Sequence, residues 1–570
     1  MKLQITTSIL IFFLAGCGAD SKDSEIDKEQ DNQDLPQNSG QLLDLTSKNM
    51  RNEVAYIPPQ CYTDTIDSQD QVYNPCYSCH IPSSEPNYIN DGDLQLAYIF
   101  PEYAQKNHWE NLFKDRTQTV AAIADEEIIN YVRRDNYKNE RGEIILANIL
   151  ANVPSGWDFN KDGVWSGYTP DSYFNFDGEG FDRNPDGEIT GWRAFAYTPF
   201  LGTFWPTNGS TDDVLIRLSD VFRYDENGEQ DLTVYKLNLA IVESLIKRKN
   251  IMIDSVDERK YGVDLDKNGR LATAEKITYD WAPLEGRSMS FVGQARLEQE
   301  AGKVHLAAGL FPEGTEFLHS VRYIGIKDDG GIAIAPRMKE LRYAKKIGWQ
   351  TYAELEAAAM AEIKEKSDFP DRLKEYIGDV EKGISNNQGW VYQGFIEDAN
   401  GELRPQTFEE TVFCMGCHGT IGATTDGVFA FPRKLNGSAF QQGWYHWAQK
   451  DLKGLTDPIR SDGKAEYAWY LEQNGAGDEF RSNEEVINKF FTQDGKLLPD
   501  AIARLANDIT YLINPSTARA LLLNKAYKTI VEEQSFVAGR DATITPMQNI
   551  HKKRVREDQP TGIETIITGP

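Results

Sequence analysis

The sequence predicts a mainly α-helical protein of several domains, with irregular, loop-rich segments and minor β content. The chain has 570 residues, of which 40% are hydrophobic, enough for several separate cores. Apolar residues recur at helical spacing toward both ends, whereas turn residues and aromatics dominate the middle. The expected regions are a signal segment at 1–16, an acidic tether at 17–45, and folded regions at 46–150, 151–285, 286–385 and 386–570.

The N-terminus resembles a bacterial lipoprotein signal. Lys2 supplies positive charge, Ile5 to Leu14 are mostly apolar, and Leu14-Ala15-Gly16-Cys17 resembles a lipobox that is cleaved before Cys17. An ordinary secretory signal is the alternative, but the cysteine at the cleavage point favours lipidation. Gly18 stands where an aspartate would resemble an inner-membrane retention signal. We therefore expect a lipid anchor on Cys17 in the outer membrane, facing the periplasm or the cell surface.

Helices are expected where apolar residues recur at a spacing of three and four. One strand is expected at 316–324, a partly alternating run rich in β-formers, with a turn at 328–331. The last stretch, 540–570, has little apolar pattern and either wraps the surface or is loose. The expected helices are 94–113, 120–132, 232–253, 352–366, 484–491, 500–512 and 516–533.

A five-residue motif, C-x-x-C-H, occurs twice. This spacing is the attachment signature of a c-type haem, in which two thiols bond to the porphyrin and the histidine ligates iron. A zinc site with four thiolates, or two redox dithiols, would not explain a histidine directly after each pair. The residues expected to bind two covalent haem c groups are Cys76, Cys79 and His80, and Cys414, Cys417 and His418.

With these motifs and its lipobox, the chain resembles the bacterial dihaem c-type cytochrome lipoproteins. The resemblance is sharp over the two motifs and the N-terminus only. It implies a multidomain c-type cytochrome with two haem-bearing regions around the middle of the chain, working with partner redox proteins.

The sixth ligand of each iron must come from elsewhere in the chain. His108 and His446 follow their motif histidines at the same spacing, and each precedes a tryptophan, so we expect them to be the distal ligands. The alternative is that both are ordinary surface or core histidines. Other candidates are His305 and His319, and, for methionine ligation, Met252, Met289, Met338 and Met547. The remaining thiol, Cys61, is expected to be buried and inert, with iron ligation as a minor alternative.

Three acidic loops in the middle region predict calcium binding. One loop matches the complete EF-hand pattern, with Asp264, Asp266, Asn268 and Glu275 as ligands and Gly269 at the bend. Two more loops carry the first half of the pattern but lack its final glutamate, and an Asx-rich surface turn is the alternative for both. Their candidate ligands are Asp158, Asn160 and Asp162, and Asp182, Asn184 and Asp186.

The charge and the motifs together limit the function. The formal net charge is −28 with acids and bases interspersed, so no basic stripe suited to nucleic acid is present. Electron transfer by two six-coordinate haems is the leading expectation, and an acidic surface would suit a basic partner. The alternative is a dihaem peroxidase or oxygenase, in which one iron stays open for a small-molecule oxidant or substrate. A calcium-stabilised binding protein with structural haem ranks last.

Overall fold

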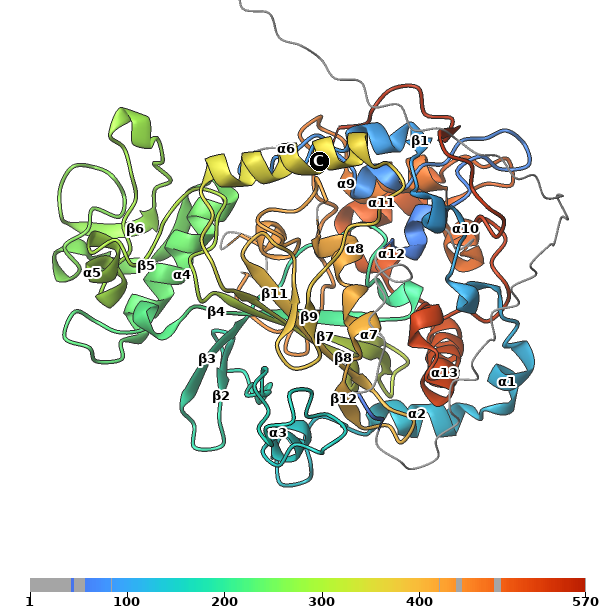
Figure 1. Ribbon diagram of the computed structural model, residues 1–570, viewed down its shortest axis with the longest axis horizontal. Helices are drawn as coiled ribbons and strands as arrows, with labels where there is room; N and C mark the ends of the chain where they lie inside the picture. The colour runs from blue at the N-terminus through green and yellow to red at the C-terminus, as the bar shows by residue number, and fades with distance from the viewer. Residues whose placement is uncertain are drawn as a thin grey trace, which may run out of the picture. The chain divides into compact units, whose positions relative to one another are not determined.

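An antiparallel sheet of nine strands runs through the computed structural model, which describes residues 43–45, 57–83, 85–419, 421–436, 443–475 and 483–568 (Figure 1). The strand order is β2-β3-β4-β7-β8-β11-β10-β9, and β12 pairs with β11. The described residues belong to one compact unit. The expected signal segment, Cys17 and nearly all of the tether lie outside them. The sheet strands are β2 (Phe181–Arg183), β3 (Ile189–Ala194), β4 (Thr211–Arg217), β7 (Glu316–Ile326), β8 (Ile332–Lys346), β9 (Gly378–Asp379), β10 (Gly383–Ser385), β11 (Trp390–Glu397) and β12 (Leu403–Pro405).

The expected mainly α-helical fold is therefore wrong. Helices account for 31% of the structure and strands for 19%, and the strands form one large sheet. The sequence does not predict the long strand β8, because its many lysines, arginines and glutamates suggest an exposed helix. In the structure most of these charges are buried instead: Lys339 and Lys346 are 0% and 1% exposed. Buried charges of this kind require partners, which only the folded chain reveals.

The β7–β8 hairpin confirms the expected strand and the turn after it. The amide of Lys327 donates to the carbonyl of Gly331 at 2.8 Å, and Gly330 takes a positive φ of 83° that the turn requires. The hairpin register pairs Glu316 with Lys345. Residues of this hairpin contribute to a hydrophobic core, through Leu318 and Leu341, and to the cavity described below, through His319 and Arg342.

Most expected helices are present with shifted ends, but the expected helices at 120–132 and 500–512 are each divided into two shorter helices. Helix α4 stops at Lys247, where Arg248 adopts a left-handed conformation, and β5 (Ile251–Asp257) follows and pairs with β6 (Thr273–Ile277). The expected helix at 94–113 is wrong: this segment forms short 3-10 turns around the two-residue strand β1 (Ala97–Tyr98). The helices are α1 (Thr117–Ala122), α2 (Asp125–Arg133), α3 (Ile145–Leu150), α4 (Leu232–Lys247), α5 (Gln294–Glu300), α6 (Tyr352–Asp368), α7 (Phe408–Val412), α8 (Met415–His418), α9 (Glu466–Asn474), α10 (Glu484–Phe490), α11 (Pro499–Asn507), α12 (Thr510–Ile513) and α13 (Thr517–Glu533).

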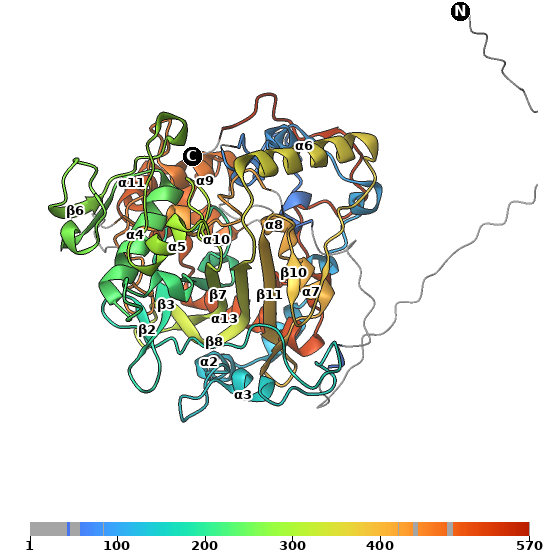
Figure 2. The same cartoon turned by 60° about the vertical axis from the view of Figure 1, so that its left-hand side comes forward.

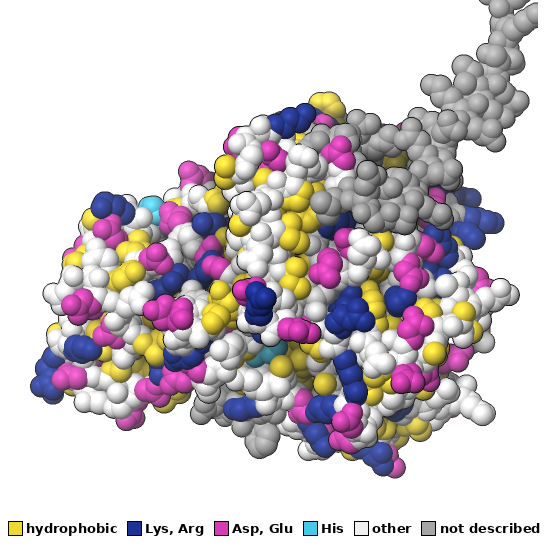
Figure 3. Space-filling model, turned by 90° about the horizontal axis from the view of Figure 1, so that it is seen from below, with side chains coloured by type: hydrophobic (Ala, Val, Ile, Leu, Met, Phe, Trp, Pro, Cys, Tyr) yellow, Lys and Arg dark blue, Asp and Glu magenta, His cyan; other side chains and the backbone are white. Residues whose placement is uncertain are grey.

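The helices lie around the sheet in separate groups. Helix α6 lies above the sheet and α3 below it in both ribbon views, and α4, α5, β5 and β6 lie together at the left (Figures 1 and 2). Apolar residues of α1, α2 and α13 pack against β7 and β11 in a shared core. On the face seen in Figure 3, acidic and basic side chains are interspersed.

The C-terminal stretch wraps around the first part of the chain. Strand β13 (Gln559–Pro560) pairs with β1, and the amide of His551 donates to the carbonyl of Tyr62 at 2.8 Å. Thr561 is fully buried and contacts Gln95 and Asn74. Of the two alternatives expected for 540–570, the wrapped one is confirmed.

Candidate functional site

Both C-x-x-C-H motifs fold into the same helical turn. The amide of His80 donates to the carbonyl of Cys76 at 2.8 Å, and the amide of His418 donates to that of Cys414 at the same distance. In the first motif this turn follows Pro75, and in the second it continues from α7 into α8. A single turn places two cysteines and the following histidine within reach of one large planar ligand.

The two motifs also open on one cavity. Its volume is about 1120 Å³, above the range of about 300–1,000 Å³ typical of pockets for drug-sized ligands. Cys79 and His80 line it from the first motif, and Cys414, Cys417 and His418 line it from the second. Segments far apart in the sequence therefore meet at one site.

Backbone contacts hold the motifs side by side. The amide of Ala423, just after the second motif, donates to the carbonyl of Cys79 at 3.1 Å. The side-chain amide of Asn87 donates to the carbonyl of Gly422 at 3.1 Å. A Cβ on Gly422 would lie 2.3 Å from the carbonyl oxygen of Ile81, so only glycine permits this approach.

Each motif histidine has a hydrogen-bond partner for one ring nitrogen. Nδ1 of His80 lies 2.8 Å from Oδ2 of Asp91, and Nδ1 of His418 lies 2.7 Å from the carbonyl oxygen of Gly427. The carbonyl can only accept, so His418 carries its proton on Nδ1 and leaves Nε2 as a lone pair. Burial lowers the pKa of His418 to about 4, which keeps the ring neutral. Metal-binding histidines have this arrangement.

Burial disfavours the thiolate form of Cys61, Cys76, Cys414 and Cys417. Cys61, Cys76, Cys414 and Cys417 are free, and burial raises the pKa of Cys76 to about 12 and that of Cys417 to about 11. Cys61 also lines the cavity, where burial and then the nearby Cys76 and Cys417 raise its thiol pKa. A raised pKa disfavours the thiolate form that ligation of iron would need.

Three histidines line the cavity in the described part of the chain: the two motif histidines and His319. His319 lies on β7, with Nε2 3.2 Å from Oδ2 of Asp212 and its ring against Phe204. His319 and His418 line the same cavity. His319 is thus the histidine best placed to approach a group bound at the second motif.

The two histidines expected as distal ligands, His108 and His446, do not line the cavity. His446 is buried, with Nε2 2.7 Å from Oδ2 of Asp213, and His108 stacks on Tyr103. His305 stacks on Trp349. The four methionines considered as ligands do not line the cavity either: Met289 and Met338 are core residues, Met547 is packed against the core, and Met252 is exposed. The equal spacing of His108 and His446 after their motifs has no structural counterpart.

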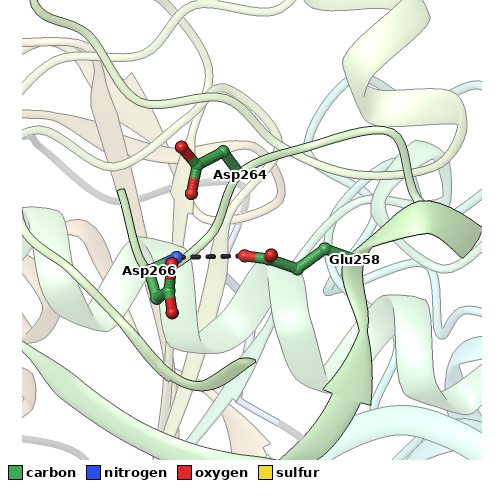
Figure 4. Close-up of side chains that lie close together, drawn as sticks. All are labelled: Glu258, Asp264 and Asp266. Atoms are coloured by element: carbon green, nitrogen blue, oxygen red, sulfur yellow. Dashed lines mark hydrogen bonds between the residues drawn. The ribbon is translucent and has the colours of Figure 1, made fainter. Parts of the chain in front are cut away.

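The complete acidic loop gathers three carboxylates, one of them unexpected. Ligand oxygens of Glu258, Asp264 and Asp266 lie within 4.8 Å of one another (Figure 4). Glu258 is buried and accepts hydrogen bonds from the amides of Leu265 and Asp266. Glu275, the expected final ligand, is exposed on β6. The loop therefore connects the 3-10 turn Glu258–Lys260 to β6, and the buried Glu258 precedes the loop in the sequence.

A second loop has the same plan. Glu381 is buried and accepts hydrogen bonds from the amides of Phe159 and Ser166. The residues at the same two positions of the first loop are Leu265 and Ala272, and their amides donate to Glu258. Asp158 accepts from the amides of Asp162 and Gly163. No sequence pattern identifies Glu258 or Glu381, because both lie outside the loop motif.

The third loop is a hairpin turn. Asp182 is a buried residue of β2 whose carboxylate accepts from the amides of Tyr173 and Asn175. Asn184 begins the turn between β2 and β3, where its side chain accepts from the amide of Glu188, and Asp186 is exposed. This geometry matches the Asx-rich turn, which was the alternative for this loop.

Comparison with known proteins gives the family. The chain matches a lipoprotein family model over residues 45–507. It is 31% identical over 547 residues to an "Uncharacterized lipoprotein" of Aquifex aeolicus (strain VF5), with 87% of each chain covered. No solved structure matches. Within the described ranges, no helix has the length and apolar character needed to cross a membrane. The chain belongs to this lipoprotein family.

Proposed function

We propose that this lipoprotein is a dihaem c-type redox protein that exchanges electrons with partner proteins at the outer membrane, held there by a lipid on Cys17. One observation carries the proposal. Both C-x-x-C-H motifs face one large cavity, and each motif histidine has its Nδ1 occupied and its Nε2 available.

The residues present fit two covalently attached haems. Cys76 and Cys79 would hold one, with His80 as its axial ligand, and Cys414, Cys417 and His418 would hold the other. Bound haem supplies one-electron redox chemistry. The chain contributes two imidazoles whose Nδ1 atoms are held by hydrogen bonds, four thiols and a shared apolar enclosure, which includes Ile89, Leu94, Phe100, Phe317, Tyr392 and Val428.

The two motif histidines differ in their partners. A carboxylate beside Nδ1, as Asp91 provides for His80, makes the imidazole a stronger electron donor than a carbonyl does. Gly427 provides only a carbonyl for His418. We infer that the haem at His80 has the lower reduction potential, which would give the pair a direction for electron flow.

The coordination is also unequal. We assign His319, rather than His108 or His446, as the sixth ligand candidate at the second motif. The described residues that line the cavity include no other histidine besides those of the motifs, so none is left to be the sixth ligand at the first motif. This asymmetry favours a second candidate function, a haem oxidoreductase acting on a small oxidant at the first site.

EPR and absorption spectra of the fully oxidised protein test the proposal. Two haems that give only low-spin signals, unchanged by peroxide, support the electron carrier. One low-spin and one high-spin haem, the latter reacting with peroxide, support the oxidoreductase. A protein purified from cells with active haem-attachment machinery that carries no haem would contradict both.

A further inference from the structure

Two arginines and a glutamate form what we call the guanidinium corner, beside the second motif. Arg342 of β8, Arg540 and Glu340 all line the cavity. Oε2 of Glu340 accepts from Nε of Arg342 at 2.9 Å and from Nη1 of Arg540 at 2.8 Å. Although burial opposes its charge, Arg342 and Arg540 hold the pKa of Glu340 at about 2, so it is ionised.

Several hydrogen-bond donors of the guanidinium corner have no partner among the described residues. Nη1 and Nη2 of Arg342 have no hydrogen-bond partner among the described residues, and Nε of Arg540, a residue only 9% exposed, is also unpartnered. The guanidinium carbon of Arg342 lies 5.1 Å from the ring centre of Phe204 and 6.0 Å from that of Phe413, which limits its movement. Arg540 also donates to the backbone carbonyl of Glu410, but the carboxylate of Glu410 pairs with Arg404, so the two guanidinium groups share the carboxylate of Glu340 and one positive charge is left without a paired anion. A buried charge without a partner is costly, so an anion is expected there.

We propose that the guanidinium corner binds a carboxylate group inside the cavity. The two terminal nitrogens of Arg342 match the two oxygens of a carboxylate, and its remaining nitrogen is already held by Glu340. The guanidinium carbons of Arg342 and Arg540 lie 6.0 Å and 4.6 Å from the ring centre of Phe413, the residue before Cys414, so the carboxylate would lie next to the second motif. It could come from a propionate of a haem attached there, which rests on the proposed function, or from a small carboxylic acid that enters from solution.

Variants of Arg342 in the full-length, detergent-purified protein test the proposal. Arg342→Gln removes the charge and Arg342→Lys keeps it but loses the paired donors. Arg433→Gln is the matched control, because Arg433 also pairs with a carboxylate, Glu466, and is 16% exposed against 15% for Arg342, but it does not line the cavity. Haem content is measured first. The midpoint potential of each haem and the thermal stabilisation by sodium acetate, with sodium chloride as the salt control, then follow.

The two sources give different results. If a propionate occupies the corner, Arg342→Gln lowers the potential of one haem, Arg342→Lys changes it less, and acetate has no specific effect on the native protein. If a free carboxylic acid occupies the corner, acetate stabilises the native protein saturably, and Arg342→Gln weakens acetate binding by roughly ten- to a hundredfold. Equal potentials and equal acetate responses in the native protein and both variants would overturn the proposal. Should the protein lack haem, the proposed function fails, and the acetate response alone decides on the corner.

Discussion

Replacing Asp426 with asparagine tests how the chain holds His418 in place. Asp426 is 9% exposed and precedes Gly427, whose carbonyl accepts from His418. Its carboxylate contacts Nζ of Lys346 at 2.7 and 2.9 Å and also accepts from Nε1 of Trp390 at 3.2 Å. Asp426 has a positive φ of 47°, which asparagine tolerates, so the substitution changes charge without straining the backbone.

The expected loss is large because the variant leaves a buried ammonium alone. The side chain of Lys346 is 0% exposed, and breaking a buried ion pair by removing one partner costs about 3–5 kcal/mol. Adding Lys346→Met removes the isolated charge and should restore most of that stability. Asp328→Asn is the control: Asp328 pairs with Arg133 but is 96% exposed, so its loss should be about 0–1 kcal/mol.

Urea unfolding of the single and double variants gives these free energies, and EPR of the same samples reports on the iron that we propose His418 ligates. We expect a loss of stability and an altered low-spin signal in Asp426→Asn, with the stability largely recovered in the double variant. If Asp426→Asn and Asp328→Asn lose equal stability and both keep the native EPR signal, the claim that Asp426 holds Gly427, and through it His418, in position is wrong.

Three further predictions concern the remaining carboxylates. Asp91→Asn should raise the midpoint potential of the haem proposed at the first motif, since the imidazole of His80 becomes a weaker donor; spectroelectrochemistry showing equal potentials would contradict this. Calcium removal should lower the melting temperature, and Asp264→Ala or Glu258→Gln should abolish most of that change in calorimetry, whereas Asp186→Ala should leave it intact. The folded pKa of Glu340 lies below its usual 4.5, so its contribution of about 3 kcal/mol is present above that pH and is lost as the pH falls toward about 2. Glu340→Gln should therefore show a smaller fall in unfolding free energy between pH 4.5 and pH 2.5.

Local signals in the sequence predicted local structure well. Helix α6 begins at a capping box in which Thr351 and Glu354 satisfy each other, and its Ala-, Glu- and Lys-rich sequence has a high helix propensity. The strand at Glu316 and the turn after Lys327 were likewise readable from β-branched residues and paired glycines. Each of these depends on neighbours within a few positions.

Features that depend on distant partners could not be read in this way. The charges of β8 suggest an exposed helix until Asp426 and Glu397 are seen to pair with Lys346 and Arg337. The meeting of the two motifs depends on the path of the whole chain between them. The same is true of Asp91 and Gly427, which support the motif histidines, and no short pattern identifies either residue.

The haem count per chain tests the central claim most directly. Full-length protein made with active haem-attachment machinery should carry two haems by pyridine haemochrome assay, with a matching increase in intact mass. Replacing Cys76 and Cys79 by alanine, or Cys414 and Cys417, should each remove one haem and leave the other. A native chain without covalent haem, or one whose haem content is unchanged by both double variants, would contradict the account.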